Sequence, residues 1–449
     1  MTTTNPLLEG IRVLDLSRLL PGPFCTLYLA QMGAEVIKIE DPAGGDYARG
    51  TPDMFALVNR GKKSVTLDLR DEQHRAQFFE LARDADVVLE SFRPGVMERL
   101  GCGYEQLKAF NPRLVYASLT GYGATGPYRD WAGHDMNYLA IAGVMDQIGR
   151  AGGAPAQSNV QIADLAGGGL TCALGILAAV IGARASGQGT MIDSAMMDGS
   201  LALQTIAMST LRGSGKAPER GADMLTGALP NYTVYRCRDG KYLAVGALEP
   251  KFFAKLLEAL AELAPKPLRG RLLKALKGGG KSGKGGKKKA KSDSGTGGNQ
   301  FDKLLASVGD MSRARRVTAP VRLALQAIFL TRTRDSWAAL LGDRDACVTP
   351  ILSLDETLRD PQVVARNLIE DDNGKPAFAF PLRFSHPLTP VAPAPALGAD
   401  NDAVLGGLGK AAPASGGGAG KKAAGTARKA GGARKTPVRK GRAAKKTAG

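Results

Sequence analysis

Short apolar runs alternate with amphipathic stretches over the first 125 residues of the chain. The strand-like runs occupy residues 11–16, 34–40, 64–69, 86–92 and 114–120. An amphipathic helix is predicted over 71–84, between the third and fourth runs. Short apolar strands separated by helices are typical of a mainly parallel sheet covered on both faces. We therefore predict an α/β fold with a Rossmann-like large domain over 1–220, in which residues 133–213 are mostly helical. Ligands of such sheets bind beyond the carboxyl ends of the strands, so the loops there are expected to carry the site.

The pattern changes after residue 220. From Tyr232 the runs TVYRC and KYLAVGAL flank an Arg-Asp-Gly turn, which predicts a β-hairpin. Helices are expected near 250–263, 300–307, 318–329 and 334–341. We expect a smaller α+β domain over 221–345, with a flexible Lys/Gly-rich insertion at 277–298. A return segment over 346–409 is expected to pack on the large domain, followed by a disordered tail over 410–449.

The net charge of +18 comes from 60 basic and 42 acidic residues, but its location matters more than its size. Residues 277–298 hold seven lysines and one acid, and residues 410–449 hold twelve basic residues and no acid. These two segments contain the whole excess, so the remaining body is neutral. The body therefore gives no indication of nucleic-acid binding. The two basic segments are expected to be solvated and inert, with weak, nonspecific polyanion binding by the tail as the alternative.

The five cysteines are scattered without paired spacing, which argues against a disulfide framework or a structural zinc site. The first residues resemble no secretory signal. The longest apolar stretch, at 170–183, is 14 residues long, which is too short to span a bilayer. The ending is not a peroxisomal Ser-Lys-Leu. Together with the Ala/Gly/Arg bias, these features predict a cytoplasmic protein of a bacterium without a membrane partner.

Residues 121–126 match G-x-G-x-x-G, the pattern of dinucleotide-binding loops. Pro127 and the polar residues after it do not open a helix, and no acid ends a strand about twenty residues on, as ribose binding requires. We therefore interpret these glycines as a turn that lets the backbone approach a ligand.

Three polar residues at predicted helix starts are candidates for chemistry. His134 begins an apolar helix within GHDMNY, Asp164 opens another within IADLAGGG, and Glu249 precedes Pro250 after a strand. His74, on a polar helix, and His386, near the end, are the other histidines. Each candidate taken alone is more often an ordinary N-terminal helix residue than a catalytic one.

Five segments taken together resemble the family III CoA-transferases, most closely the branch that racemises α-methylacyl-CoA thioesters. They are GHDMNYLAIAGVMDQIGR, IADLAGGGLTCALGILAAV, GQGTMIDSAMMDG, YLAVGALEPKFF and RDACVTPIL. The resemblance covers about residues 10–405, apart from the Lys-rich insertion. It implies the family III CoA-transferase fold and an interlocked homodimer, with each active site between the large domain of one chain and the small domain of the other.

The resemblance also implies a two-base racemisation of an acyl-CoA substrate. His134 matches the base on one face of the α-carbon, Asp164 the base on the other, and Glu249 the acid that orients the histidine. At the helix start of Asp164, unpaired N–H groups are expected beside the enolate oxygen, with the glycines at 167–169 allowing close approach. The sequence offers no metal cluster and no redox cofactor motif, so no cofactor is expected. CoA is part of the substrate.

The family pattern assigns CoA contacts to the sheet loops. The expected binding residues are Arg18, Leu67, Asp68, Leu69, Arg70, Ser91, Phe92, Arg93 and Arg99, with Gly133, Asp135, Asn137 and Tyr138 around the histidine. Arginine suits bidentate phosphate contacts. The family usually has an arginine where this chain has Asp41, so either Lys38, Arg49 or Arg60 replaces it or CoA binds more weakly.

Two other functions remain as alternatives. In a CoA-transferase of the same fold, Asp164 would attack the thioester and carry the acyl group as a mixed anhydride, which leaves His134 and Glu249 without a role. A nucleic-acid-binding protein built on an inactive enzyme fold is supported only by the tail. The complete trio of His134, Asp164 and Glu249 favours the racemase.

Overall fold

The computed structural model describes residues 7–264, 266–267, 269–270, 311–406 and 408. The predicted insertion at 277–298, the helix at 300–307 and the tail at 410–449 lie outside these described residues.

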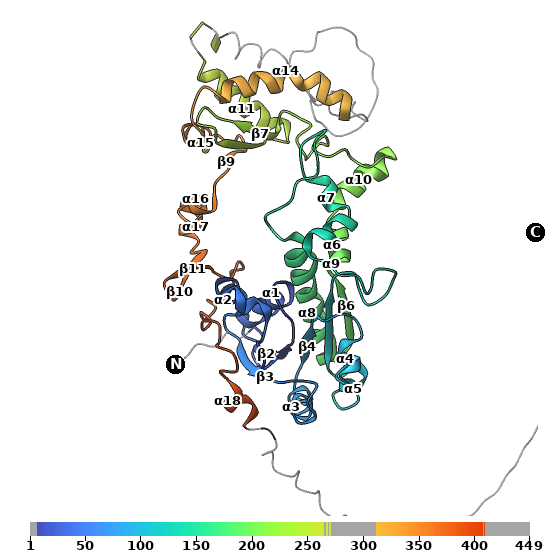
Figure 1. Cartoon of the computed structure of the whole chain (residues 1–449). Helices are drawn as coiled ribbons and strands as arrows, with labels where there is room; N and C mark the ends of the chain where they lie inside the picture. The colour runs from blue at the N-terminus through green and yellow to red at the C-terminus, as the bar shows by residue number, and fades with distance from the viewer. Residues whose placement is uncertain (1–6, 265, 268, 271–310, 407, 409–449) are drawn as a thin grey trace, which may run out of the picture. The chain divides into compact units, whose positions relative to one another are not determined.

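A six-stranded parallel sheet forms the centre of the first half of the chain, and the predicted division into a large and a small domain stays a prediction (Figure 1). Its strands are β1 (Arg12–Asp15), β2 (Glu35–Glu40), β3 (Lys63–Thr66), β4 (Val87–Glu90), β5 (Val115–Thr120) and β6 (Met191–Ala195). They lie in the order β3-β2-β1-β4-β5-β6. The five predicted strands and the α/β class are thereby confirmed. The expectation of mostly helix over 133–213 missed β6, an edge strand whose first residues remain partly exposed and whose pairing with β5 is long-range.

Helices cover both faces of this sheet because adjacent strand residues point to opposite sides. Val13 packs in a core with α1 (Pro21–Gln31) and α8 (Thr171–Ser186), whereas Leu14 packs in a second core with α3 (Glu72–Arg83). Shorter helices connect these elements. They are η1 (Tyr47–Gly50), α2 (Pro52–Asn59), α4 (Val96–Arg99), α5 (Tyr104–Lys108), α6 (Asp135–Ile141), α7 (Val144–Gln147), α9 (Met196–Ala202) and α10 (Thr205–Ser214).

A π-helix, η2 (Ala163–Leu170), runs directly into α8. Together they form a helix of 24 residues that is long and apolar enough to cross a membrane, although the predicted apolar stretch was shorter. One such helix is weak evidence for a membrane span. Its inner face, with Ile176 and Val180, is buried against the sheet core, while Leu174 and Ile181 on the outer face are 70% and 71% exposed.

A separate antiparallel sheet contains the predicted hairpin. It consists of β7 (Tyr232–Arg236), β8 (Tyr242–Gly246) and β9 (Val348–Pro350), in that order. The helices α11 (Pro250–Glu262), α14 (Met311–Phe329) and α15 (Arg334–Leu341) accompany it (Figure 1). Tyr235, Phe329 and Trp337 pack together in its core. The helix α14 begins earlier than the predicted residue 318.

The segment after β9 returns to the large sheet. It comprises α16 (Leu354–Thr357), α17 (Pro361–Ala365), the hairpin β10 (Ile369–Asp372) and β11 (Lys375–Phe378), and α18 (Asn401–Leu405). Asp400 accepts a hydrogen bond from the Ser64 N–H at 2.8 Å, and Asn401 accepts one from the Thr66 N–H at 2.9 Å. These bonds attach α18 to the free edge of β3, which would otherwise be an open sheet edge.

Candidate active site

His134 and Asp164 line the same cavity, which has a volume of about 730 Å³. The cavity lies beyond the carboxyl ends of β1, β4 and β5, since its walls include residues directly after these strands. These are Arg18, Leu19, Ser91, Phe92, Arg93, Gly121 and Tyr122. A site at this edge is expected for a parallel α/β sheet.

His134 is the N-cap residue of α6 and is exposed in the cavity. Its backbone N–H donates to Asn137 Oδ1 at 3.0 Å, which fixes the start of the helix. The preceding Gly133 is needed here because an added Cβ would lie 2.7 Å from the Tyr138 ring. The helix start therefore places both His134 and Tyr138 on the cavity wall.

Asp164 lies in the first turn of η2, and the glycines after it explain the helix position. A Cβ on Gly167 would lie 2.7 Å from the Met196 carbonyl oxygen, and one on Gly169 would lie 3.0 Å from the Pro21 carbonyl oxygen. The glycines thus let η2 approach α9 and α1 closely. They serve helix packing, whereas the sequence predicted that they allow approach to the enolate.

Burial, and to a smaller extent the negative charge of Asp135, together raise the pKa of Asp164 from 3.8 to about 7. A carboxyl group with this pKa can both accept and release a proton near neutral pH.

The prediction that free N–H groups at the start of this helix hold the enolate oxygen is wrong. Asp135 Oδ1 accepts the N–H groups of Ala163 at 2.7 Å and Asp164 at 3.0 Å. The next N–H, of Leu165, donates to the Gln161 carbonyl at 2.9 Å. The first two donors are therefore occupied by a side chain from α6, which sequence position alone does not indicate, and the third is occupied by a backbone carbonyl.

Glu249 is the exposed N-cap residue of α11, and its side chain makes no capping hydrogen bond. It does not line the cavity that His134 and Asp164 share. An ordinary helix cap would use its side chain, so this carboxylate is left available for another partner.

The expected CoA contacts fall mainly along two cavities. Leu67, Asp68, Leu69 and Arg70 line a cavity of about 390 Å³, and Ser91, Arg93, Gly133, Asn137 and Tyr138 line the one that contains His134. Both cavities share Arg18, Tyr47 and Phe92. The Arg18 guanidinium lies 5.0 Å from the Phe92 ring centre and 5.2 Å from that of Tyr47. Arg99 and Asp135 line neither of the two.

The three residues expected to replace the missing arginine at Asp41 are all engaged inside the protein. Lys38 is fully buried and pairs with Asp46 at 2.9 Å, Arg49 pairs with Glu40 at 2.6 Å, and Arg60 pairs with Glu370. The expectation that they bind phosphate is therefore wrong. The arginine found next to Asp41 is instead Arg70, whose guanidinium lies 3.2 Å from the Asp41 carboxylate. The Arg70 side chain is 67% exposed.

Sequence reasoning missed several residues of the cavity walls. Tyr47, Arg129 and Trp131 line the cavity that contains His134, and Trp131 lies 4.0 Å from Tyr128, centre to centre. The available signal was the group of aromatic residues around the glycine turn at 121–126. That turn follows β5, and no helix begins directly after it. A dinucleotide-binding loop would open a helix there, so the structure agrees with the rejection of that pattern.

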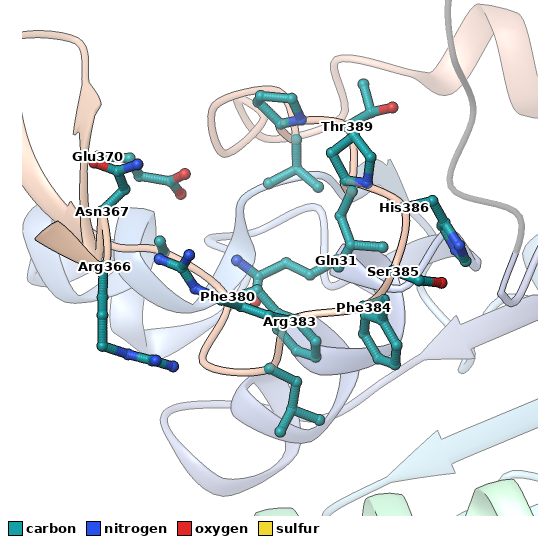
Figure 2. Close-up of a pocket in the computed structure, with 16 residues that line it drawn as sticks. Gln31, Arg366, Asn367, Glu370, Phe380, Arg383, Phe384, Ser385, His386 and Thr389 are labelled. Carbon is teal, nitrogen blue, oxygen red and sulfur yellow. The ribbon is translucent and has the colours of Figure 1, made fainter.

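A further cavity, of about 670 Å³, lies between the end of α1 and the return segment (Figure 2). Phe384 and His386 lie on one loop of it, with ring centres 6.3 Å apart. The one carboxylate in its lining belongs to Glu370, which pairs with Arg60. The cavity thus has a histidine, but it lacks the unpaired carboxyl group that accompanies the histidine in the His134 cavity.

Comparisons with known proteins give both racemases and transferases as relatives. A model described as CoA-transferase family III matches residues 8–269 and 296–401. The chain is 36% identical over 353 residues to the alpha-methylacyl-CoA racemase of Homo sapiens, covering 78% of this chain and 79% of that protein. It is 42% identical over 233 residues to the acetyl-CoA:oxalate CoA-transferase of Acetobacter aceti, covering 49% and 60%. A crystal structure of a CAIB/BAIF family protein from Brucella suis matches with a TM-score of 0.70 and 29% identity, covering 90% of this chain and 100% of that chain.

Proposed function

Because the chain belongs to CoA-transferase family III, we propose that it is a racemase that interconverts the two epimers of 2-methylacyl-CoA thioesters. The observation that carries this proposal is the presence of His134 and Asp164 in one cavity. The carboxyl group of Asp164 has a pKa of about 7. It can therefore give or take a proton at neutral pH, as an acid–base partner of the His134 imidazole must. A relative named as an alpha-methylacyl-CoA racemase gives further support.

The proposed reaction moves one proton off the α-carbon and another onto it. One base takes the α-proton, and the electrons of the C–H bond move into the thioester to form an enolate. The other residue then donates a proton to the opposite face as the thioester reforms. His134 and Asp164 exchange roles in the two directions, so both directions require one proton on the pair.

The enolate oxygen needs hydrogen-bond donors other than the first N–H groups of η2, which Asp135 occupies. Asn137 lines the cavity and accepts a hydrogen bond with its Oδ1, so its Nδ2 group remains a donor on the cavity wall. We assign the CoA moiety to the two adjoining cavities, with Arg18 between them, and no cofactor beyond this CoA.

A second copy of the chain is proposed to complete the site. Glu249 is exposed and its side chain makes no capping bond, so the partner's Glu249 is free to orient the imidazole of His134. The exposed outer face of α8, with Leu174 and Ile181, needs a covering surface, and a homodimer supplies one.

A CoA-transferase is the second candidate function, favoured by the 42% identity to a transferase over 233 residues. One experiment separates the two. The protein is incubated in D2O with a single pure epimer of a 2-methylacyl-CoA, without any carboxylic acid, and the α-position is followed by NMR. The racemase proposal predicts deuterium at the α-carbon together with epimerisation. Turnover only after a carboxylic acid is added would contradict it and favour the transferase.

A further inference from the structure

Asp135 connects the two helices that carry the proposed bases. It is the first residue of α6, directly after His134. Its Oδ1 atom accepts the backbone N–H groups of Ala163 and Asp164, which lie 28 and 29 residues further along the chain, at 2.7 and 3.0 Å. A single carboxylate oxygen therefore joins the start of α6 to the start of η2.

The two hydrogen bonds to Asp135 satisfy N–H groups at the start of η2 that have no acceptor within that helix. The first N–H groups of a helix have no acceptor within the helix, and a negative charge next to them is favourable. Ala163 is fully buried, so its N–H group cannot turn to water if Asp135 is shortened. The backbone of Asp164 would then lose its attachment to α6.

Other groups around Asp164 do not duplicate this connection. The other titratable groups on the cavity wall are Arg18, Tyr47, Arg93, Tyr122, Arg129, His134 and Tyr138. Burial and, after it, the charge of Asp164 raise the pKa of Tyr138, whereas the pKa of Asp164 itself is raised by burial and by Asp135. The helices α1 and α9, which pack on η2, contribute the uncharged Pro21 and Met196 to the wall. Asp135 is thus the residue whose charge and geometry both act on Asp164.

We propose that Asp135 is a positioning residue that fixes the carboxylate of Asp164 relative to the imidazole of His134 across the reacting carbon. This inference rests on the proposed function, in which those two groups are the bases. It differs from the contact with CoA that the sequence predicts for Asp135, because the carboxylate is engaged with the backbone of η2.

Two substitutions separate the geometry of Asp135 from its charge. Asp135→Ala removes the acceptor, and we expect kcat for epimerisation to fall about 100-fold, as for a misplacement of a reacting group by about 1 Å. Asp135→Asn keeps an oxygen acceptor but removes the charge. We expect it to restore most of the lost kcat and to move the pH profile of kcat to lower pH, because the negative charge no longer raises the pKa of Asp164.

Asp360 provides a matched control. It caps α17 by accepting the N–H groups of Gln362 at 2.9 Å and Val363 at 3.4 Å, and it lines none of the cavities described above. We expect Asp360→Ala to leave kcat and its pH profile unchanged. A purely structural role for Asp135 would lower the active fraction in both Asp135 variants without moving the pH profile, and that result would overturn the proposal.

Amide hydrogen exchange gives a readout that does not depend on the reaction. We expect faster exchange in peptides spanning 161–168 for Asp135→Ala, and exchange close to that of the parent for Asp135→Asn and Asp360→Ala. Unchanged exchange in Asp135→Ala would overturn the inference. A parent protein that incorporates no deuterium at the α-carbon would instead refute the proposed function, and amide exchange would still decide whether Asp135 holds η2.

Discussion

A methyl group on Gly199 would lie 1.9 Å from the carbonyl oxygen of Gly167. Gly199 is in α9 and Gly167 is in η2, three residues after Asp164. The backbones of the two helices are therefore in direct contact, and the position of Asp164 depends on a residue 35 positions away in the sequence.

Gly199→Ala should displace η2, because the Gly167 carbonyl belongs to the backbone and cannot rotate away. We expect a loss of about 1–3 kcal/mol in the free energy of unfolding, as for other overpacked cores, together with a fall in kcat. Denaturant unfolding and the epimerisation assay measure the two effects. Gly213→Ala in α10 is the control, since its added Cβ would meet no atom within 4 Å. Equal stability of the two variants would contradict the packing argument.

Lys62→Met should destabilise the protein strongly. Lys62 Nζ lies 3.1 Å from Asp15 Oδ2, and both side chains are fully buried. Removing the lysine leaves a buried carboxylate without this partner, which costs about 3–5 kcal/mol. The neighbouring Lys63, which is 46% exposed and pairs with Glu35, is the control, and Lys63→Met should cost about 0–1 kcal/mol. Similar unfolding midpoints in urea for both variants would show that the buried pair contributes little.

Glu90→Gln should stabilise the protein at pH 8 but not at pH 4. Burial raises the pKa of Glu90 from 4.5 to about 7. Between these values the folded state holds a proton that the unfolded state has released, so the stability contributed by Glu90 falls as the pH rises. The gain at pH 8 is at most about 3 kcal/mol. Unfolding at both pH values measures it, with the exposed Glu105→Gln as the control. A gain that is equal at both pH values would contradict the assignment.

Arg18→Ala should raise the KM for the acyl-CoA about tenfold or more, the loss expected for hydrogen bonds to a charged group. Arg18→Lys should restore only part of the affinity, because lysine lacks the planar group that lies between the Phe92 and Tyr47 rings. Arg83, the last residue of α3, makes a similar contact with the Phe110 ring and serves as the control. An unchanged KM in Arg18→Ala would place CoA elsewhere.

The sequence was sufficient for the parts that depend on local pattern. Alternating apolar runs predicted five of the six strands of the large sheet, and the motifs around His134 and Asp164 predicted two residues that the structure places in one cavity. Pairings between distant residues were not predictable in this way. The pairing of β6 with β5 and the bonds from Asp135 to η2 depend on which segments meet in three dimensions.

The same limit explains the error about phosphate binding. A lysine or arginine near a binding loop has the right charge in the sequence, but its partner decides whether that charge is available. Arg60 reaches Glu370, which is 310 residues away, and Lys38 is buried against Asp46. Long-range ion pairs of this kind leave no local signal.

Proton exchange by the two single-base variants tests the central claim most directly. Pure epimers of a 2-methylacyl-CoA are incubated in D2O with His134→Ala or Asp164→Ala, and both α-deuterium and configuration are measured. We predict that each variant loses epimerisation, exchanges the α-proton of one epimer with retention, and leaves the other epimer unlabelled, with the reactive epimer differing between the variants. Epimerisation by either variant at the rate of the parent would contradict the account.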